Sequence, residues 1–84
     1  MDTPSTSNVV AMPCTFSDIG IVSNFKPAEA SRAESLFQLT CRGKVFNCRS
    51  IHAFQWPPKE GEWAYVDGYR IAEADVHVST FLPI

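Results

Sequence analysis

The amino-acid sequence predicts an all-β protein, a small five-stranded antiparallel barrel in a single domain. The chain has 84 residues, which is the size of one domain with a small core. About five segments are rich in β-branched and aromatic residues or alternate apolar and polar residues, as strands do. Only Lys26 to Ser35 has a helix-like composition. We expect a barrel because closure removes the exposed strand edges that lead to aggregation.

The composition indicates a soluble globular protein with no general attraction to phosphates or anionic lipid. Hydrophobic residues make up 45% of the chain and charged residues 19%, and the formal net charge is −2. The three cysteines include no Cys-x-x-Cys pair, so we expect reduced thiols and a cytoplasmic location. No apolar run approaches the roughly 18 residues of a membrane span, and the acidic N-terminus predicts no export signal.

The first part of the chain is expected to contain a tail, one long strand and a loop. Residues 1–8 are mostly polar and predict a flexible tail, which places the β domain at residues 9–84. Phe16 to Phe25 has the β-branched content of a strand, and Gly20 within it indicates a bulge or a close approach of another backbone. Lys26 to Ser35 has no large apolar residue to dock on a core, so we expect a loop or a single turn there.

The segment LFQLTCRGKVFNC, residues 36–48, predicts a β-hairpin with Arg42-Gly43 as a two-residue turn. Glycine at the second turn position supplies the positive φ that a primed turn needs. Pairing across this turn, with Cys41 opposite Lys44, separates the side chains into two faces. The apolar face contains Phe37, Leu39, Cys41, Phe46 and Cys48, and the polar face contains Gln38, Thr40, Asn47 and Arg49.

Two further strands are expected after Trp56-Pro57-Pro58, which ends any strand before it because proline cannot donate to a ladder. In WAYVDGYRI, residues 63–71, Trp63 and Tyr65 alternate with Ala64 and Val66. We expect this strand to continue through Asp67-Gly68 with a glycine bulge. A final strand is expected to end at Pro83. Its side chains should alternate between the two faces, with Val76, Val78 and Thr80 on one face and His77, Ser79 and Phe81 on the other.

The segment KEGEWAYVDGYRI, residues 59–71, resembles the fourth-strand region of bacterial single-stranded DNA-binding proteins. In that family a Lys/Gly turn leads into an aromatic-Val-acid-Gly strand, to which Tyr65 to Gly68 corresponds here. The order of elements along the chain, a long strand, a polar connection, a hairpin, a turn and two strands, is likewise similar to an OB-fold. The resemblance implies an OB-like barrel, and with it the family's binding of single-stranded nucleic acid.

Cations and aromatic residues suited to a binding surface occur in the second half of the chain. A sequence-tolerant site for single strands combines aromatic side chains that stack on bases with cations that contact phosphates. Aromatic residues on a rigid sheet are also typical of protein interfaces, and a small barrel needs some of them for its core. The candidate binding residues are Arg42, Lys44, Arg49, Phe54, Trp56, Trp63 and Tyr65.

The sequence also contains possible metal ligands and possible catalytic residues, but their spacing predicts neither function. Cys41, Cys48 and His52 have the spacing C-x6-C-x3-H, whereas zinc ligands usually come in pairs about two to four residues apart. His52 or His77 as a base, with Cys48 or Ser50 as a nucleophile, would be linked by sequence proximity alone. The sequence therefore predicts no metal, no cofactor and no enzyme activity.

These observations favour a small non-enzymatic binding protein that acts through an aromatic sheet face on a protein partner, as an adaptor or inhibitor. The net charge of −2 departs from the basic groove of proteins that bind single-stranded DNA, so single-stranded nucleic acid is the alternative target. Pairing of the protein with its own copy through an edge strand is a further expectation. No interaction with a membrane is expected.

Overall fold

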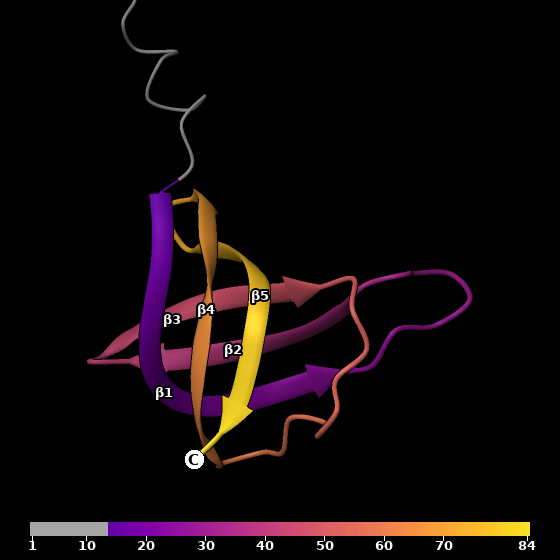
Figure 1. Ribbon diagram of the computed structural model, residues 1–84, viewed down its shortest axis with the longest axis horizontal. Coiled ribbons are helices and arrows are strands. Elements are labelled where there is room, and N and C mark those ends of the chain that lie inside the picture. Colours follow the sequence, from indigo (N-terminus) through magenta and orange to yellow (C-terminus); the bar gives the residue numbers. More distant parts are fainter. Residues whose placement is uncertain (1–13) are drawn as a thin grey trace, which may run out of the picture.

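The computed structural model describes residues 14–84, which form five strands and no helix (Figure 1). The strands are β1 (Cys14–Lys26), β2 (Ser35–Cys41), β3 (Lys44–Ser50), β4 (Trp63–Ala72) and β5 (Asp75–Pro83). The predicted all-β class is therefore confirmed. The tail predicted for residues 1–8, and the predicted start of the domain at residue 9, lie outside the described residues.

The five strands close into a barrel in the order β1-β2-β3-β5-β4, and β1 pairs with both β2 and β4. Every neighbouring pair is antiparallel except β3 and β5, which are parallel. This corrects the prediction of a fully antiparallel barrel. The reason is geometric, because strands that alternate in direction cannot close a ring when their number is odd. In this barrel the two neighbouring strands that run in the same direction are β3 and β5, which pair over a short seam, Asn47 to Arg49 with Asp75 to His77.

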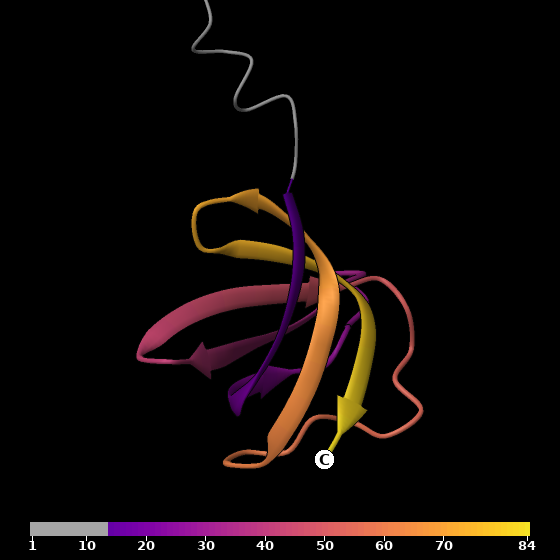
Figure 2. The same ribbon diagram turned by 60° about the vertical axis from the view of Figure 1, so that its left-hand side comes forward.

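The long strand β1 bends so that its first part pairs with β4 and its last part with β2 (Figures 1 and 2). Gly20 lies at this bend. A Cβ atom on Gly20 would lie 2.5 Å from the Thr40 carbonyl oxygen and 2.8 Å from Cys41 Sγ, both on β2. The close approach predicted for this glycine is therefore confirmed, and only a residue without a side chain leaves room for β2 at this point.

The β2–β3 hairpin has the predicted turn and the predicted register. Cys41 pairs with Lys44 across the turn, and the pairing continues from there to Ser35 and Ser50. Arg42 and Gly43 have φ values of 50° and 81°, as a primed two-residue turn requires. The inner face consists of the buried side chains of Phe37, Leu39, Cys41, Phe46 and Cys48.

The β4–β5 hairpin confirms one prediction and corrects another. Strand β4 continues through Asp67-Gly68, and the register shifts between these two residues as predicted for a bulge. The extra residue of the bulge is on β5. Asp67 pairs with Thr80 and Gly68 pairs with Val78, so Ser79 has no partner on β4. The expected alternation of β5 is therefore wrong beyond Ser79. Phe81 pairs with the buried Val66 and turns inward, and Leu82 turns outward.

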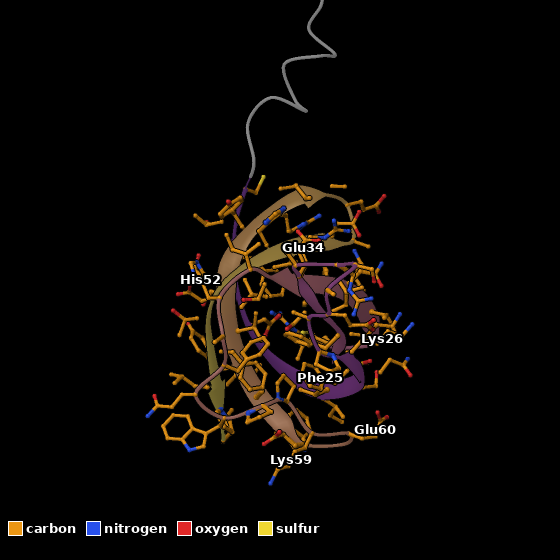
Figure 3. The ribbon with its side chains drawn as sticks, turned by 90° about the vertical axis from the view of Figure 1, so that its right-hand side faces the viewer. Phe25, Lys26, Glu34, His52, Lys59 and Glu60 are labelled. Carbon is orange, nitrogen blue, oxygen red and sulfur yellow. The ribbon has the colours of Figure 1, made fainter. Side chains whose placement is uncertain are left out.

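The core fills the barrel, and an aromatic cluster closes one end of it. Phe54 comes from the loop between β3 and β4, and its ring centroid lies 6.1 Å from that of Phe25, 6.1 Å from Phe37 and 5.2 Å from Phe81. Figure 3 looks onto this end, where Phe25 lies beside the loop that carries His52, Lys59 and Glu60. The buried apolar residues are Phe16, Val22, Phe37, Leu39, Cys41, Phe46, Cys48, Ala64, Val66, Val76 and Val78.

The connection between β1 and β2 contains no helix, as predicted for Lys26 to Ser35. It forms a tight turn in which the backbones of Glu29 and Arg32 hydrogen-bond to each other at 2.8 and 3.1 Å. Arg32 also donates to the carbonyl oxygens of Pro27 and Glu34. These hydrogen bonds hold the loop in its turn conformation.

Replacing Gly20 by alanine tests the bend of β1. The new methyl group would collide with the β2 backbone, which cannot rotate away as a side chain can, so we expect a loss of about 2–3 kcal/mol of unfolding free energy. Urea unfolding measures this loss. Gly61→Ala is the control, because Gly61 has a φ of 81° but nothing lies within 4 Å of an added Cβ. This variant should lose only about 1 kcal/mol of unfolding free energy, from the strain of a positive φ. An equal or smaller loss at Gly20 would contradict the steric explanation.

Candidate binding surfaces

Two rows of apolar side chains cover the outside of the barrel over β1, β4 and β5. In one row Tyr65 of β4 pairs with Ile19 on one side and Leu82 on the other. In the next row Trp63 pairs with Ile21, and the backbone of Ile84 donates to the Trp63 carbonyl oxygen at 3.0 Å. Paired residues of a sheet point to the same side. We name this surface the apolar sheet face, and it consists of Ile19, Ile21, Trp63, Tyr65, Leu82 and Ile84.

The apolar sheet face is well exposed and carries no charge. The exposed fractions are 47% for Ile19, 54% for Trp63, 46% for Leu82 and 72% for Ile84. Neighbouring strands lie about 4.8 Å apart, so the face is about 10 Å wide between its outer strands. Solvent-facing positions of a sheet are usually polar, which makes two adjacent apolar rows a departure that calls for an explanation.

Tyr65 is held in place at the border of this face by two hydrogen bonds. Its hydroxyl group lies 2.9 Å from Ser17 Oγ and donates to Asp67 Oδ2 at 3.2 Å. Both partners lie in the next row of the same outer surface, where Ser17 pairs with Asp67. The ring is therefore fixed before any partner arrives, which lowers the entropy that binding costs.

A second surface, the polar groove, is a shallow depression of about 530 Å³ over β2 and β3. A row of amides crosses it. Asn24 donates to Gln38 at 2.6 Å, Gln38 donates to Asn47 at 3.1 Å, and Asn47 donates to Asp75 at 3.4 Å. Lys26 and Arg49 also line the groove, so it combines amides with cations. It contains no tryptophan or tyrosine.

The seven predicted binding residues lie in separate places. Trp63 and Tyr65 share the apolar sheet face, and Trp56 is 52% exposed in the loop between β3 and β4. Phe54 is half-buried and packs in the aromatic cluster. The three cations lie on the β2–β3 hairpin, with Arg42 and Lys44 at its turn and Arg49 near its other end. The barrel therefore brings two of the four aromatic residues together and keeps them away from the cations.

Two of the predicted cations are engaged by carboxylates. Arg42 Nη2 lies 2.7 Å from Asp18 Oδ2, and Arg49 Nη1 lies 3.7 Å from Glu34 Oε1. The Nε atom of Arg49 is buried without a hydrogen-bond partner. Lys44 lies instead over the ring of Phe46, with its Nζ 5.7 Å from the centroid. Neutralised cations contribute less to phosphate binding than free ones.

The two buried cysteines, Cys41 and Cys48, have thiols with raised pKa values. Burial raises the pKa of Cys41 to about 11 and the pKa of Cys48 to about 12. Both are free of disulfide bonds. Because the thiolate is the nucleophile and the metal ligand, these thiols are poorly suited to either role at neutral pH.

The other groups considered for catalysis have structural contacts. Ser50 Oγ donates to the carbonyl oxygen of His52 and accepts from its backbone N–H, both at 3.2 Å, so the bonds involve the backbone and not the imidazole. The ring of His77 stacks on Tyr69 with centroids 5.5 Å apart. Within residues 14–84, no three His, Cys, Asp or Glu side chains are grouped as metal ligands would be.

No protein family, curated protein or solved structure matches the chain. In the described part of the chain, no helix is long and apolar enough to cross a membrane. The chemistry of the barrel's own surfaces is therefore the guide to what it binds.

Four residues of the apolar sheet face were absent from the predicted binding set: Ile19, Ile21, Leu82 and Ile84. The alternation of Ile19 and Ile21 with Gly20 and Val22 signals that these two face outward, whereas Leu82 and Ile84 face outward against the alternation of β5. Their meeting with Trp63 and Tyr65 depends on the pairing of β4 with β1 and β5, and the extra residue at Ser79 reverses the end of β5. Sequence spacing alone contains neither fact.

Replacing Asp18 by asparagine tests the ion pair at the hairpin turn. The hydrogen bond from Arg42 lowers the pKa of Asp18 in the folded protein. The carboxylate therefore stabilises the fold above its unfolded pKa of about 3.9, and this contribution is lost as the pH falls through the folded pKa. We expect D18N to be less stable than the wild type at neutral pH and to lose less stability below about pH 4. Urea unfolding at a series of pH values measures both effects, and parallel curves for the two proteins would contradict the assignment.

Proposed function

We propose that the protein is a small non-enzymatic binding module that docks a protein partner on its apolar sheet face. The observation that supports this most directly is the double row of apolar side chains over β1, β4 and β5, with Trp63 54% and Ile84 72% exposed. An adaptor or inhibitor acts by such docking and needs no reactive group.

The apolar sheet face has the chemistry of an interface centre. Side chains on the opposite side of the same strands, such as Ala64 and Val66, already fill the core, so the outer rows are not needed for folding. Contiguous apolar patches on soluble proteins commonly mark interaction sites. Tryptophan and tyrosine are the residues that contribute most at interface hot spots, and the hydrogen bonds of Tyr65 make it a rigid anchor.

The distribution of charge favours a protein over a nucleic-acid strand at this face. Stacking of bases on aromatic rings is useful to a protein only where cations reach the phosphates between them. The face itself contains no cation, and the nearest acidic groups include Asp67, which accepts from Tyr65. An aromatic surface without cations is suited to apolar side chains of a partner.

Face-to-face docking is also favoured over pairing at a strand edge. Each of the five strands has a neighbour on both sides over part of its length, so no strand has one side unpaired along its whole length to accept another strand. A homo-oligomer, if it forms, would then bury the apolar sheet face and not extend the sheet.

The second candidate function is binding of single-stranded nucleic acid in the polar groove. We propose that the barrel is of the OB type, because β1 pairs with both β2 and β4 and because β5 lies between β3 and β4. OB-folds bind oligonucleotides on the face formed by strands 2 and 3, where this protein has its amide row and the cations Lys26 and Arg49. The lack of stacking aromatics in the groove makes this the weaker candidate.

Replacing Trp63 by alanine tests the proposed partner site. The protein should be used to capture partners from its native host, with Trp56→Ala as the matched control because Trp56 is exposed to a similar extent, 52%. We expect a partner that W56A retains and W63A loses, with an affinity at least about tenfold lower for W63A when the purified pair is titrated. A partner that both variants bind equally would contradict the assignment of the site, and unfolding of W63A would show that Trp63 is needed for the fold.

Titration with oligo-dT at low salt separates the two candidate functions. We expect the tryptophan fluorescence to stay unchanged, since neither Trp56 nor Trp63 lines the polar groove. Amide NMR shifts should also stay unchanged at Gln38 and Asn47. Saturable shifts at these two residues that weaken as salt rises would favour the nucleic-acid candidate instead.

A further inference from the structure

A third surface, the basic cleft, lies at the end of the barrel that contains the turn of the β2–β3 hairpin. In Figure 2 the turns of the two hairpins lie toward the same side of the molecule. The cleft has a volume of about 360 Å³. It is lined by β1, by the turn of the β2–β3 hairpin and by the end of β4. Its charged and aromatic lining residues are Phe16, Asp18, Arg42, Lys44, Phe46 and Arg70.

Two cations in the cleft gather on one aromatic ring. Lys44 Nζ lies 5.7 Å and Arg70 Cζ 5.9 Å from the centroid of Phe46. Arg70 pairs in register with the fully buried Val76, so it shares the inner side of the barrel and points into the open end. The negative faces of an aromatic ring attract cations, so Phe46 holds both an ammonium group and a guanidinium group at this end of the barrel.

Neither of these two cations is paired with a carboxylate of the described residues. Within residues 14–84, the ion pairs are those of Arg32, Arg42 and Arg49, and neither Lys44 nor Arg70 takes part in one. The one acidic residue in the cleft, Asp18, is engaged by Arg42 at 2.7 Å. Among the residues that the structure describes, the cleft therefore has two positive charges without an acidic partner, in a chain whose net charge is −2.

We propose that the basic cleft binds the phosphate group of a phosphomonoester between Lys44 and Arg70. A phosphomonoester has a charge of about −1.5 to −2 at neutral pH, which matches the two free cations. The guanidinium group of Arg70 can donate two parallel hydrogen bonds to phosphate oxygens, and Lys44 supplies a compact positive charge. The phosphate belongs either to a free small molecule or to the 5′ end of a nucleic-acid strand.

This site is separate from the proposed partner site. The apolar sheet face is formed by residues on the outer side of β1, β4 and β5, whereas Lys44 lies on β3 and Arg70 points toward the inner side of β4. Neither cation belongs to the polar groove. Loss of one function by mutation should therefore leave the others intact.

Titration of ¹⁵N-labelled protein tests the proposal by NMR. The ligands are thymidine 5′-monophosphate, thymidine without phosphate, and oligo-dT with and without a 5′-phosphate. We expect saturable shifts of the Lys44, Phe46 and Arg70 amides with phosphorylated ligands and not with thymidine. Binding of thymidine 5′-monophosphate would assign the site to free phosphomonoesters, and binding of 5′-phosphorylated oligo-dT alone would assign it to strand ends.

Charge-matched variants show whether the cleft itself binds the ligand. Arg70→Gln and Lys44→Gln should each weaken binding at least about tenfold, because each removes a charged partner of the phosphate. Lys59→Gln makes the same change in net charge on an exposed loop residue and should change the affinity less than about twofold. Lys44 is exposed at the end of β3, so K44Q keeps the test valid if R70Q fails to fold. An equal loss in K59Q, equal binding of thymidine, or no saturation below about 10 mM ligand would overturn the proposal.

Discussion

The rest of the barrel depends on the bend of β1 at Gly20, where β2 packs closely against the strand. One strand pairs with β4 along its first part and with β2 along its last part, and a hydrogen atom in place of a side chain lets β2 lie against the bend. Without this strand the two hairpins would meet only along the short parallel seam between β3 and β5. The bend therefore decides that the outer surface of β4 lies beside Ile19 and Ile21, and so it creates the apolar sheet face as well as closing the core.

Charge and apolarity are separated on this small surface. The apolar rows cover β1, β4 and β5, the amides lie across β2 and β3, and Lys44 and Arg70 lie at one open end around Phe46. An apolar partner and an anionic ligand would each meet a region suited to it, without a charge that must be desolvated or an apolar group left exposed. A barrel has this capacity because every strand has an outer side that the core does not use.

Local pattern predicted most of the fold, and long-range pairing explains what it missed. The β2–β3 hairpin was predictable residue by residue because its turn chemistry and its two-residue alternation agree, and Gly20 and Gly68 were recognised because glycine within a strand implies close backbone contact. The parallel β3–β5 seam follows from the count of strands in a closed ring, which no single segment contains. The candidate sites were harder, because Trp63, Leu82 and Ile19 come together only through registers between distant strands, and Arg70 reaches Phe46 across the open end of the barrel.

The unpaired Ser79 has a consequence for how such a surface can arise or disappear. One extra residue in β5 is the difference between Phe81 inside with Leu82 outside, as found here, and the reverse arrangement. If Ser79 paired with Asp67 in a regular ladder, the rest of β5 would shift by one residue and the two side chains would exchange sides without a change in any apolar residue. The chemistry of this part of the outer surface is thus set by the register of β5 as much as by its composition.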